Sequence, residues 1–196
     1  MRRRKHIRLR EYDYSQPGAY FITVCVKDRD EMFGEIVDGE MKRNACGNSV
    51  QSCWEEWPTH FENIQPDEFI VMPNHIHGII ILDQLGRDVQ LNIPTGHYHS
   101  RISPRSGSLS VIVRTFKAAV TTEYRKKGYT DFCWQSRFYD HIIHSEKSLN
   151  RIRGYIRTNP QQWAWDRENA KCNGMDEFDR WLNEEGRHKI PKGRDS

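Results

Sequence analysis

The first half of the chain alternates between runs of β-branched or aromatic residues and short polar turns. The run 19–26 is the strongest of these and predicts a strand in the centre of a sheet. The runs 33–37 and 40–43 flank Asp38-Gly39, a dipeptide that is typical of type I′ turns. This part of the chain therefore predicts one central strand followed by a β-hairpin.

Two further strand-like runs, 67–72 and 75–82, are separated by Pro73-Asn74. Because proline cannot donate a hydrogen bond to a sheet, we expect a bulge, a kink or a tight turn immediately before the second run. The chain from 83 to 107 lacks periodicity and is interrupted by prolines and glycines, which predicts a long loop. The segment 132–139 predicts another short strand or an extended segment.

Apolar residues recur at helical spacing in three places. The first helix is predicted from about 47 to 59, with Trp54 and Trp57 packed in the core rather than stacked on bases. The second is predicted to be capped by Ser108 and to run to Gly128. The third begins at Ser145 and must end before Pro160, because proline cannot continue a helix. Its buried stripe consists of Leu149, Ile152 and Ile156.

Composition limits the protein to a small set of classes. With 196 residues, of which 36% are apolar and 11% aromatic, the chain can bury one good core, so a single domain with extensions is expected. The five cysteines show no Cys-x-x-Cys spacing, so they indicate neither a disulfide framework nor a zinc knuckle and favour a reducing compartment. No run resembles a signal peptide or a membrane span, and we expect a cytoplasmic protein.

Charge is unevenly distributed, although the net charge is only +3 with histidine neutral. The first ten residues contain six cations and no acid, an arm that commonly contacts phosphate and here is a candidate for binding DNA. A solvated, disordered terminus explains the same composition equally well. The six cations are Arg2, Arg3, Arg4, Lys5, Arg8 and Arg10.

His75 and His77 form the most informative pattern in the chain. In a strand, residues i and i+2 point to the same face, so both imidazoles are expected to project side by side from the surface of the sheet. Such a pair is a two-point site for a divalent metal, and Mg²⁺, Mn²⁺, Ni²⁺ and Zn²⁺ all remain open. Two histidines hold a metal weakly, so catalysis would need a third ligand and a nucleophile from another segment.

Tyr155 and Asn159 lie four residues apart in the third predicted helix and therefore share a face. A tyrosine hydroxyl, with a pKa of about 10, is a poor nucleophile, but it can attack a phosphodiester that a metal polarises. The amide oxygen of Asn159 could complete the coordination of a hard cation. Without the histidines, the same two residues would be interpreted as a packing residue and a helix cap.

Two motifs carry a resemblance to a known family. The segment 72–80 resembles the His-hydrophobe-His motif of the single-tyrosine transposases of the insertion-sequence 200 type, the HUH transposases, and the segment 154–160 resembles their nucleophile helix. The segments 18–26 and 134–143 are most similar to the subgroup called REP-associated tyrosine transposases. The similarity extends over about 12–166, and both motifs occur in the expected order.

This resemblance implies an α+β fold, in which a ferredoxin-like antiparallel sheet is packed against helices. It also implies a division into a basic arm at 1–17, a single-tyrosine transposase domain at 18–166 and a tail at 167–196 to which no role is assigned. The sheet would carry the two histidines, and a helix would present the tyrosine.

Carried onto this chain, the resemblance implies that His75, His77 and Asn159 bind Mg²⁺ or Mn²⁺. Tyr155 would attack a phosphodiester in single-stranded DNA, with the metal stabilising the charge that develops in the transition state. The products would be a 5′-phosphotyrosine and a free 3′-hydroxyl. Because the ester conserves the energy of the phosphodiester, a 3′-hydroxyl could later rejoin the strand without ATP.

The family also implies a substrate and an assembly. REP-associated enzymes occur beside repetitive extragenic palindromes, so the expected substrate is a DNA hairpin with a short single-stranded flank, and a monomer is favoured over a homodimer. Two other functions remain open. One is a regulator that binds DNA hairpins without cutting them, and the other is a metal-dependent hydrolase that activates water and forms no covalent intermediate.

Overall fold

The computed structural model describes residues 12–83, 107–172 and 177–188. The strands are β1 (Gly18–Cys25), β2 (Gly34–Val37), β3 (Glu40–Arg43), β4 (Ile64–Val71), β5 (His75–Leu82) and β6 (Tyr139–Ile143). The α-helices are α1 (Ala45–Glu56), α2 (Leu109–Lys126), α3 (Glu146–Thr158) and α4 (Glu177–His188). Three short 3₁₀ helices complete the set: η1 (Lys27–Arg29), η2 (Trp57–His60) and η3 (Asn159–Trp165).

Four strands form one antiparallel sheet in the order β4-β5-β1-β6. Along the chain, its elements follow the succession β1, α1, β4, β5, α2, β6, with β1 and β5 at the centre of the sheet. This is the ferredoxin-like arrangement, so the expected α+β fold class is confirmed. The predicted central position of the first strand is also confirmed, because β1 pairs with β5 and with β6.

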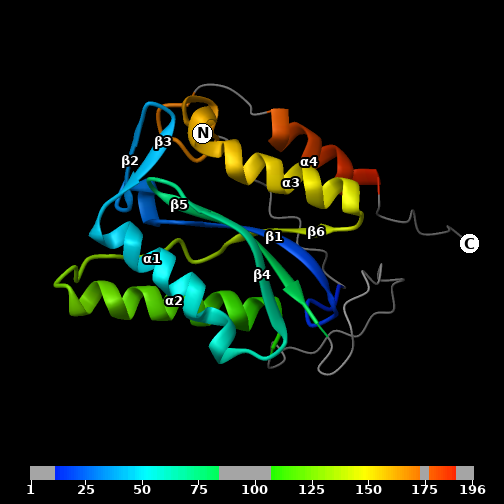
Figure 1. The fold of residues 1–196 in the computed structure, drawn as a ribbon, viewed down its shortest axis with the longest axis horizontal. Coiled ribbons are helices and arrows are strands. Elements are labelled where there is room, and N and C mark those ends of the chain that lie inside the picture. The colour runs from blue at the N-terminus through cyan, green and yellow to red at the C-terminus, as the bar shows by residue number, and fades with distance from the viewer. Residues whose placement is uncertain (1–11, 84–106, 173–176, 189–196) are drawn as a thin grey trace, which may run out of the picture.

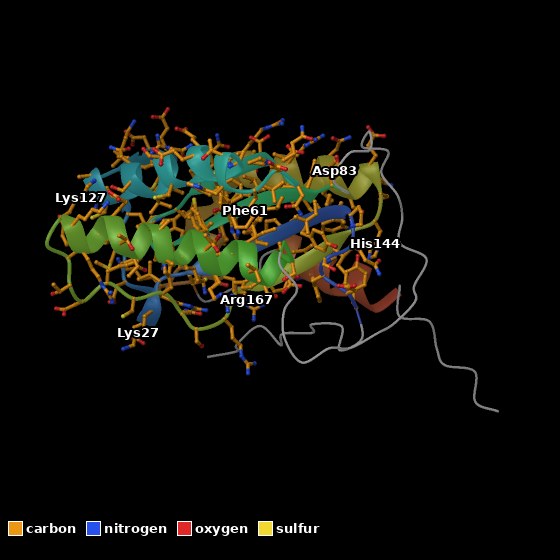
Figure 2. The ribbon with its side chains drawn as sticks, turned by 90° about the horizontal axis from the view of Figure 1, so that it is seen from below. Lys27, Phe61, Asp83, Lys127, His144 and Arg167 are labelled. Atoms are coloured by element: carbon orange, nitrogen blue, oxygen red, sulfur yellow. The ribbon has the colours of Figure 1, made fainter. Side chains whose placement is uncertain are left out.

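Helices cover both faces of the sheet (Figure 1): α1 and α2 lie on one face, and α3 and α4 lie on the other. Figure 2, seen from the side of α2, places Lys127 and Asp83 at opposite ends of the domain. Because side chains alternate along a strand, β5 contributes to both layers. Ile76 and Ile80 pack in the core under α1 and α2, whereas Ile79 packs in the core under α3 and α4.

The strand that carries the histidine pair is fitted to a tryptophan on its other face. A Cβ built on Gly78 would lie 2.5 Å from the Cη2 atom of Trp54, so only glycine leaves room for that ring. Trp54 is also stacked on Phe69, with ring centroids 4.1 Å apart and an interplanar angle of 11°. Trp54 and Trp57 are both buried, which confirms that these rings pack in the core.

The turns agree with their sequence signals. Asp38 and Gly39 both have positive φ, 53° and 76°, as a type I′ turn requires, and the predicted β2–β3 hairpin is confirmed. Before β5 the chain makes a tight turn, closed by a hydrogen bond of 2.8 Å from the Met72 amide to the His75 carbonyl. The bulge lies instead in β4, between Pro66 and Phe69, where the pairing with β5 shifts.

Two local expectations are met only in part. The segment 132–139, expected as a short strand or an extended segment, makes only an isolated bridge between Trp134 and Val26, and the regular strand β6, Tyr139–Ile143, begins at its last residue. Ser108 occupies the N-cap position of α2 as expected, but its side chain makes no capping hydrogen bond, and its Oγ atom is buried with no hydrogen-bond partner among the residues that the structure describes. Most of the expected loop, 84–106, lies outside the described residues.

Candidate active site

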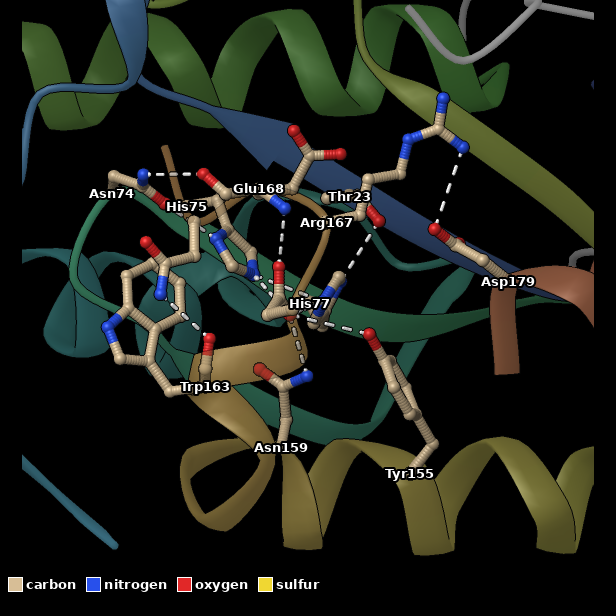
Figure 3. A network of polar contacts seen from close by, with 12 residues as sticks. Thr23, Asn74, His75, His77, Tyr155, Asn159, Trp163, Arg167, Glu168 and Asp179 are labelled. Atoms are coloured by element: carbon tan, nitrogen blue, oxygen red, sulfur yellow. Dashed lines mark hydrogen bonds and ion pairs between the residues drawn. The ribbon is translucent and has the colours of Figure 1, made fainter. Parts of the chain in front are cut away.

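His75 and His77 project from the start of β5 toward the α3 face of the sheet (Figure 3), and their Nε2 atoms lie 3.1 Å apart. The expectation that they share one face is confirmed. They do not lie on the surface, however, because both side chains are completely buried. The surface expectation failed because helices cover both faces of this sheet, which a strand pattern alone cannot show.

Each histidine is oriented through its Nδ1 atom by a different neighbour. Nδ1 of His75 lies 2.8 Å from Oδ1 of Asn74, and Nδ1 of His77 lies 2.9 Å from Oγ1 of Thr23, its partner across the β1–β5 pair. Asn74 is itself fixed, because its Nδ2 donates to the carbonyls of Arg29 and Glu168. These contacts direct both Nε2 atoms inward, as in metal sites where a second hydrogen bond fixes each ring.

Asp166 completes the cluster, and sequence reasoning did not single it out. Its Oδ2 atom lies 3.8 Å from Nε2 of His75 and 3.8 Å from Nε2 of His77, although Asp166 follows Tyr155 by eleven residues. The backbone amide of Glu168 donates to the other carboxylate oxygen over 2.6 Å. The sequence offered only a weak signal, an acid six residues after the Asn159-Pro160 pair. If the helix of Tyr155 continued regularly, Asp166 would lie far from the histidines.

Asp166 stays ionised in this environment. Burial alone would raise the pKa of its carboxyl, but attraction to His75 and His77, together with hydrogen bonds from His77 and Asn159, holds the pKa well below its usual range. A carboxyl with such a low pKa is a weak proton acceptor. Asp166 is therefore better suited to bind a cation as a charged ligand than to act as a general base.

The three residues have the chemistry and spacing of a divalent metal site. A triangle with sides of 3.1, 3.8 and 3.8 Å has a centre about 2.1 Å from each corner, which matches the bonds of divalent metals to imidazole nitrogen and carboxylate oxygen. Two imidazoles and a carboxylate form a mixed donor set that Mg²⁺, Mn²⁺ or Zn²⁺ can accept. This His-His-Asp group could therefore hold one ion.

Asn159 lies beside this group, at the junction of α3 and η3. Its Nδ2 donates a hydrogen bond of 2.9 Å to Oδ2 of Asp166, so its nearest polar contact is the carboxylate. Its Oδ1 is buried and has no hydrogen-bond partner within the described structure. An orphaned buried oxygen is unusual and fits a group that completes its bonding only with a bound ion.

Tyr155 reaches the same carboxylate from α3. Its hydroxyl lies 3.5 Å from Oδ2 of Asp166, and its ring centroid lies 5.3 Å from that of His77. Phe178 of α4 is stacked on the tyrosine, with centroids 3.6 Å apart and an interplanar angle of 8°. The structure thus brings together His75, His77, Tyr155 and Asn159, the four residues selected from the two motifs.

Two ion pairs fasten the tyrosine helix to the edge of the sheet. Arg153 contacts both carboxylate oxygens of Asp67, and Arg157 pairs with Glu68 at 2.7 Å. The two acids occupy the bulge of β4, where the extra residue allows consecutive side chains to reach α3. Tyr155 lies between the two arginines in sequence, so these contacts, together with the apolar stripe of α3, hold it against the sheet.

Other expectations concern residues that the structure does not describe. The arm with its six cations, Arg2, Arg3, Arg4, Lys5, Arg8 and Arg10, lies outside the described residues. In the described part of the chain, no helix is both long enough and apolar enough to cross a membrane.

Comparison with known proteins places this site in a family. No protein-family model matches the chain. An uncharacterized protein of Haemophilus influenzae is 41% identical over 166 residues, which are 83% of this chain and 91% of that protein, so the two belong to one family. A second Haemophilus influenzae protein, provisionally named a REP-associated tyrosine transposase, is 25% identical over 148 residues, 76% of this chain and 73% of its own length. The chain is thus similar to a protein that carries the name of the REP-associated tyrosine transposases.

The fold agrees with this relationship. A solved structure of a REP-associated tyrosine transposase bound to a REP hairpin superposes with a TM-score of 0.53 at 19% identity and covers 81% of this chain and 74% of its own. The resemblance drawn from the two motifs is confirmed. The cluster of His75, His77 and Asp166 therefore lies in a chain whose fold is similar to that of the solved REP-associated tyrosine transposase.

Proposed function

We propose that this chain is a transposase that cleaves and joins single-stranded DNA with the help of a divalent metal. One observation carries the proposal. The hydroxyl of Tyr155 and the Nε2 atoms of both histidines converge on the same oxygen of Asp166, so a nucleophile and a metal-binding group share one site. The kinship with REP-associated tyrosine transposases supports an enzyme that acts on DNA.

In the proposed site, His75, His77 and Asp166 hold Mg²⁺ or Mn²⁺, and the neighbouring Oδ1 of Asn159 is available as a further ligand. When bound, the ion supplies Lewis-acid polarisation of the scissile phosphate. Asn74 and Thr23 keep the imidazoles in the orientation that presents Nε2 to the ion. The buried surroundings exclude water, which would compete with the tyrosine for the phosphorus.

Tyr155 is the proposed nucleophile. A bond forms between its phenolic oxygen and the phosphorus while the bond from phosphorus to the 3′ oxygen breaks, which leaves a 5′-phosphotyrosine. The phenol loses one proton and the departing 3′ oxygen gains one, so the step is balanced without a further reactant. Attack by a 3′-hydroxyl on the tyrosyl ester reverses the step and joins strands.

The proposed substrate is a DNA hairpin of the repetitive extragenic palindrome type with an unpaired flank. Support comes from the solved relative, which is bound to a REP hairpin. We assign the contact with the hairpin to the arm that carries Arg2, Arg3, Arg4, Lys5, Arg8 and Arg10, in a cytoplasmic enzyme that acts as a monomer.

The decisive test is the substitution Tyr155→Phe, which removes one oxygen and preserves the packing on Phe178. With labelled hairpins, the wild type in Mn²⁺ should give a covalent adduct that survives denaturing electrophoresis, and the variant should give neither adduct nor nick. Tyr139→Phe, on β6, serves as the matched control and should retain both.

The same experiment separates the alternatives. Nicking without an adduct in the Tyr155→Phe variant would identify a hydrolase that activates water. Binding without nicking in the wild type would identify a regulator. Mapping of the adduct peptide to another tyrosine would refute the assignment of the nucleophile.

A further inference from the structure

Trp165, at the end of η3, is the most exposed of the large apolar side chains in the described residues. Its side chain is 64% exposed, against 45% for Tyr129 and 40% for Val37. The chain has six tryptophans, and the other five are buried or half-buried. A single exposed apolar residue is ordinary on a protein surface, so the position of this indole is what carries the argument.

Trp165 directly precedes Asp166, so its Cα lies about 3.8 Å from that of a residue in the candidate metal site. Two residues earlier, the Trp163 ring lies 6.0 Å from the His75 ring at an angle of 31°. In Figure 3, Trp163 flanks the histidine pair on the side opposite Tyr155. The η3 segment therefore carries one half-buried indole beside His75 and, two residues later, an exposed indole.

The exposed indole is attached to fixed backbone. The amide of Asp166 donates to the carbonyl of Trp163 over 3.1 Å, and Nδ2 of Asn169 donates to the same carbonyl over 2.9 Å. The β2–β3 turn also packs on η3, since a Cβ on Gly39 would lie 3.4 Å from the side chain of Gln161. On such a backbone, only the two side-chain torsions of the ring have to be ordered when a ligand stacks on it.

The opposite side of the site is closed. Tyr155 is 7% exposed and is covered by the stacked ring of Phe178 from α4. Asp166 and Asn159 are buried as well. Among the described residues, a large exposed ring next in sequence to the cluster is thus found at η3, one residue before Asp166, where a nucleotide attached to a phosphate at the cluster could reach it.

We propose that Trp165 is a stacking platform for the unpaired base next to the phosphodiester that Tyr155 attacks. This inference rests on the proposed function and adds a binding residue to it. An indole stacks on the face of any base, and such contacts are sequence-tolerant. The face is free only in a single strand, because a duplex buries it between neighbouring bases. Trp165 would therefore contribute to the selection of single-stranded over double-stranded DNA.

Binding measurements in the Tyr155→Phe background test the platform without any need for cleavage. The probes are labelled oligo(dT) and a duplex of equal length, followed by fluorescence polarisation. Trp165→Leu keeps apolar bulk but removes the aromatic face, and it should weaken oligo(dT) binding by about 5- to 150-fold while duplex binding changes less than twofold. Trp165→Phe should retain an intermediate affinity. Tyr129→Leu, which removes another exposed ring, should match the parent.

Unchanged oligo(dT) affinity in Trp165→Leu would overturn the platform, and so would an equal loss for single strand and duplex. An equal loss of oligo(dT) affinity in Tyr129→Leu would also overturn it, because the effect would then not depend on the position of Trp165. Failure of the proposed function would give a different result. The wild type would form no covalent adduct, while the Trp165→Leu substitution would still weaken binding of oligo(dT) more than binding of the duplex.

Discussion

Asp166 shows how much one side chain can decide in this site. Its Oδ2 is approached by Tyr155, by Asn159 and by both histidines, while its Oδ1 is held by the amide of Glu168. Five groups, from β5, from the stretch of α3 and η3 and from the chain after η3, thus meet at one carboxylate. A buried charge in such a place is tolerated only because these neighbours compensate its desolvation.

The substitution Asp166→Asn tests whether this carboxylate is a metal ligand. It removes the charge and keeps the shape, so Mn²⁺ affinity should fall by at least about 10- to 100-fold, the range known for loss of supporting residues in metal sites. Titration calorimetry on the purified protein measures the change. Asp131→Asn, at an exposed position, is the control and should bind Mn²⁺ as the wild type does. Equal affinities in both variants would remove Asp166 from the ligand set.

Two glycines near the site should respond in opposite ways to the same change. Gly78→Ala forces a methyl group against the Trp54 ring and should lower the free energy of unfolding by about 1–3 kcal/mol. Gly154→Ala, inside α3 with no atom within 4 Å of the new methyl group, should raise it by about 0.5–1 kcal/mol. Urea denaturation compares the two, and a shift in the same direction for both would contradict this account.

At the level of elements, α3 is positioned by side chains rather than by the sheet's hydrogen bonds. Ser145 caps its start by accepting a hydrogen bond from the amide of Ser148, and its apolar stripe packs on the sheet. Its height above β4 is set by the contacts of Arg153 with Asp67 and of Arg157 with Glu68. The bulge in β4 therefore has a role in placing the tyrosine.

Asp67→Asn should disturb this placement without affecting the metal group. Loss of the two-pronged contact with Arg153 should slow adduct formation by about tenfold, since displacements of about 1 Å at a reacting atom reduce rates by up to about 100-fold. Single-turnover kinetics with a labelled hairpin give the rate, and calorimetry should show unchanged Mn²⁺ affinity. Glu40→Gln, which removes an exposed ion pair with Lys42, should leave the rate unchanged.

The elements that sequence alone predicted well are those with strong local signals. The Asp38-Gly39 turn, the β5 strand and the Ser145 cap each follow from residues within a few positions of one another. The limits of β6 were not predicted, because β6 is an edge strand and its limits depend on pairing with β1, which is distant in sequence. The bulge in β4 is likewise fixed by its partner strand.

The candidate site was predictable where it forms regular structure. The shared face of His75 and His77 follows from the period of a strand, and Tyr155 and Asn159 follow from the period of a helix. Asp166 was missed because η3 interrupts that period after Thr158, so no simple spacing relates the acid to the histidines. Burial of the histidines was missed because it depends on how distant helices pack.

In the molecule as a whole, the residues of the site lie on elements that are held with different strength. The histidines lie on β5, which is hydrogen-bonded to β4 on one edge and to β1 on the other. Tyr155 lies on a helix that packs on one face, beneath Phe178 and Leu182 of α4. Free energies of local opening are highest in central strands and lower in peripheral helices.

Amide hydrogen exchange should make this division visible. The amides of β5 and β1 should exchange only through global unfolding, whereas those of α4 should exchange through smaller openings and therefore sooner. Mass spectrometry of peptides after dilution into deuterated buffer measures the order. Faster exchange in β5 than in α4 would contradict this assignment.

Because β5 is hydrogen-bonded on both edges, the sheet should outlast α4 during denaturation. Mild heating or a low concentration of urea should release α4 while the sheet, α3 and η3 survive. The population formed in this way would keep His75, His77 and Asp166 and still capture Mn²⁺, but Tyr155 would lose the stacked ring of Phe178 and link itself to DNA poorly. Inactivation would then precede loss of metal binding during denaturation. The protein would thus lose its two partners, the ion and the strand, at different points on one unfolding curve.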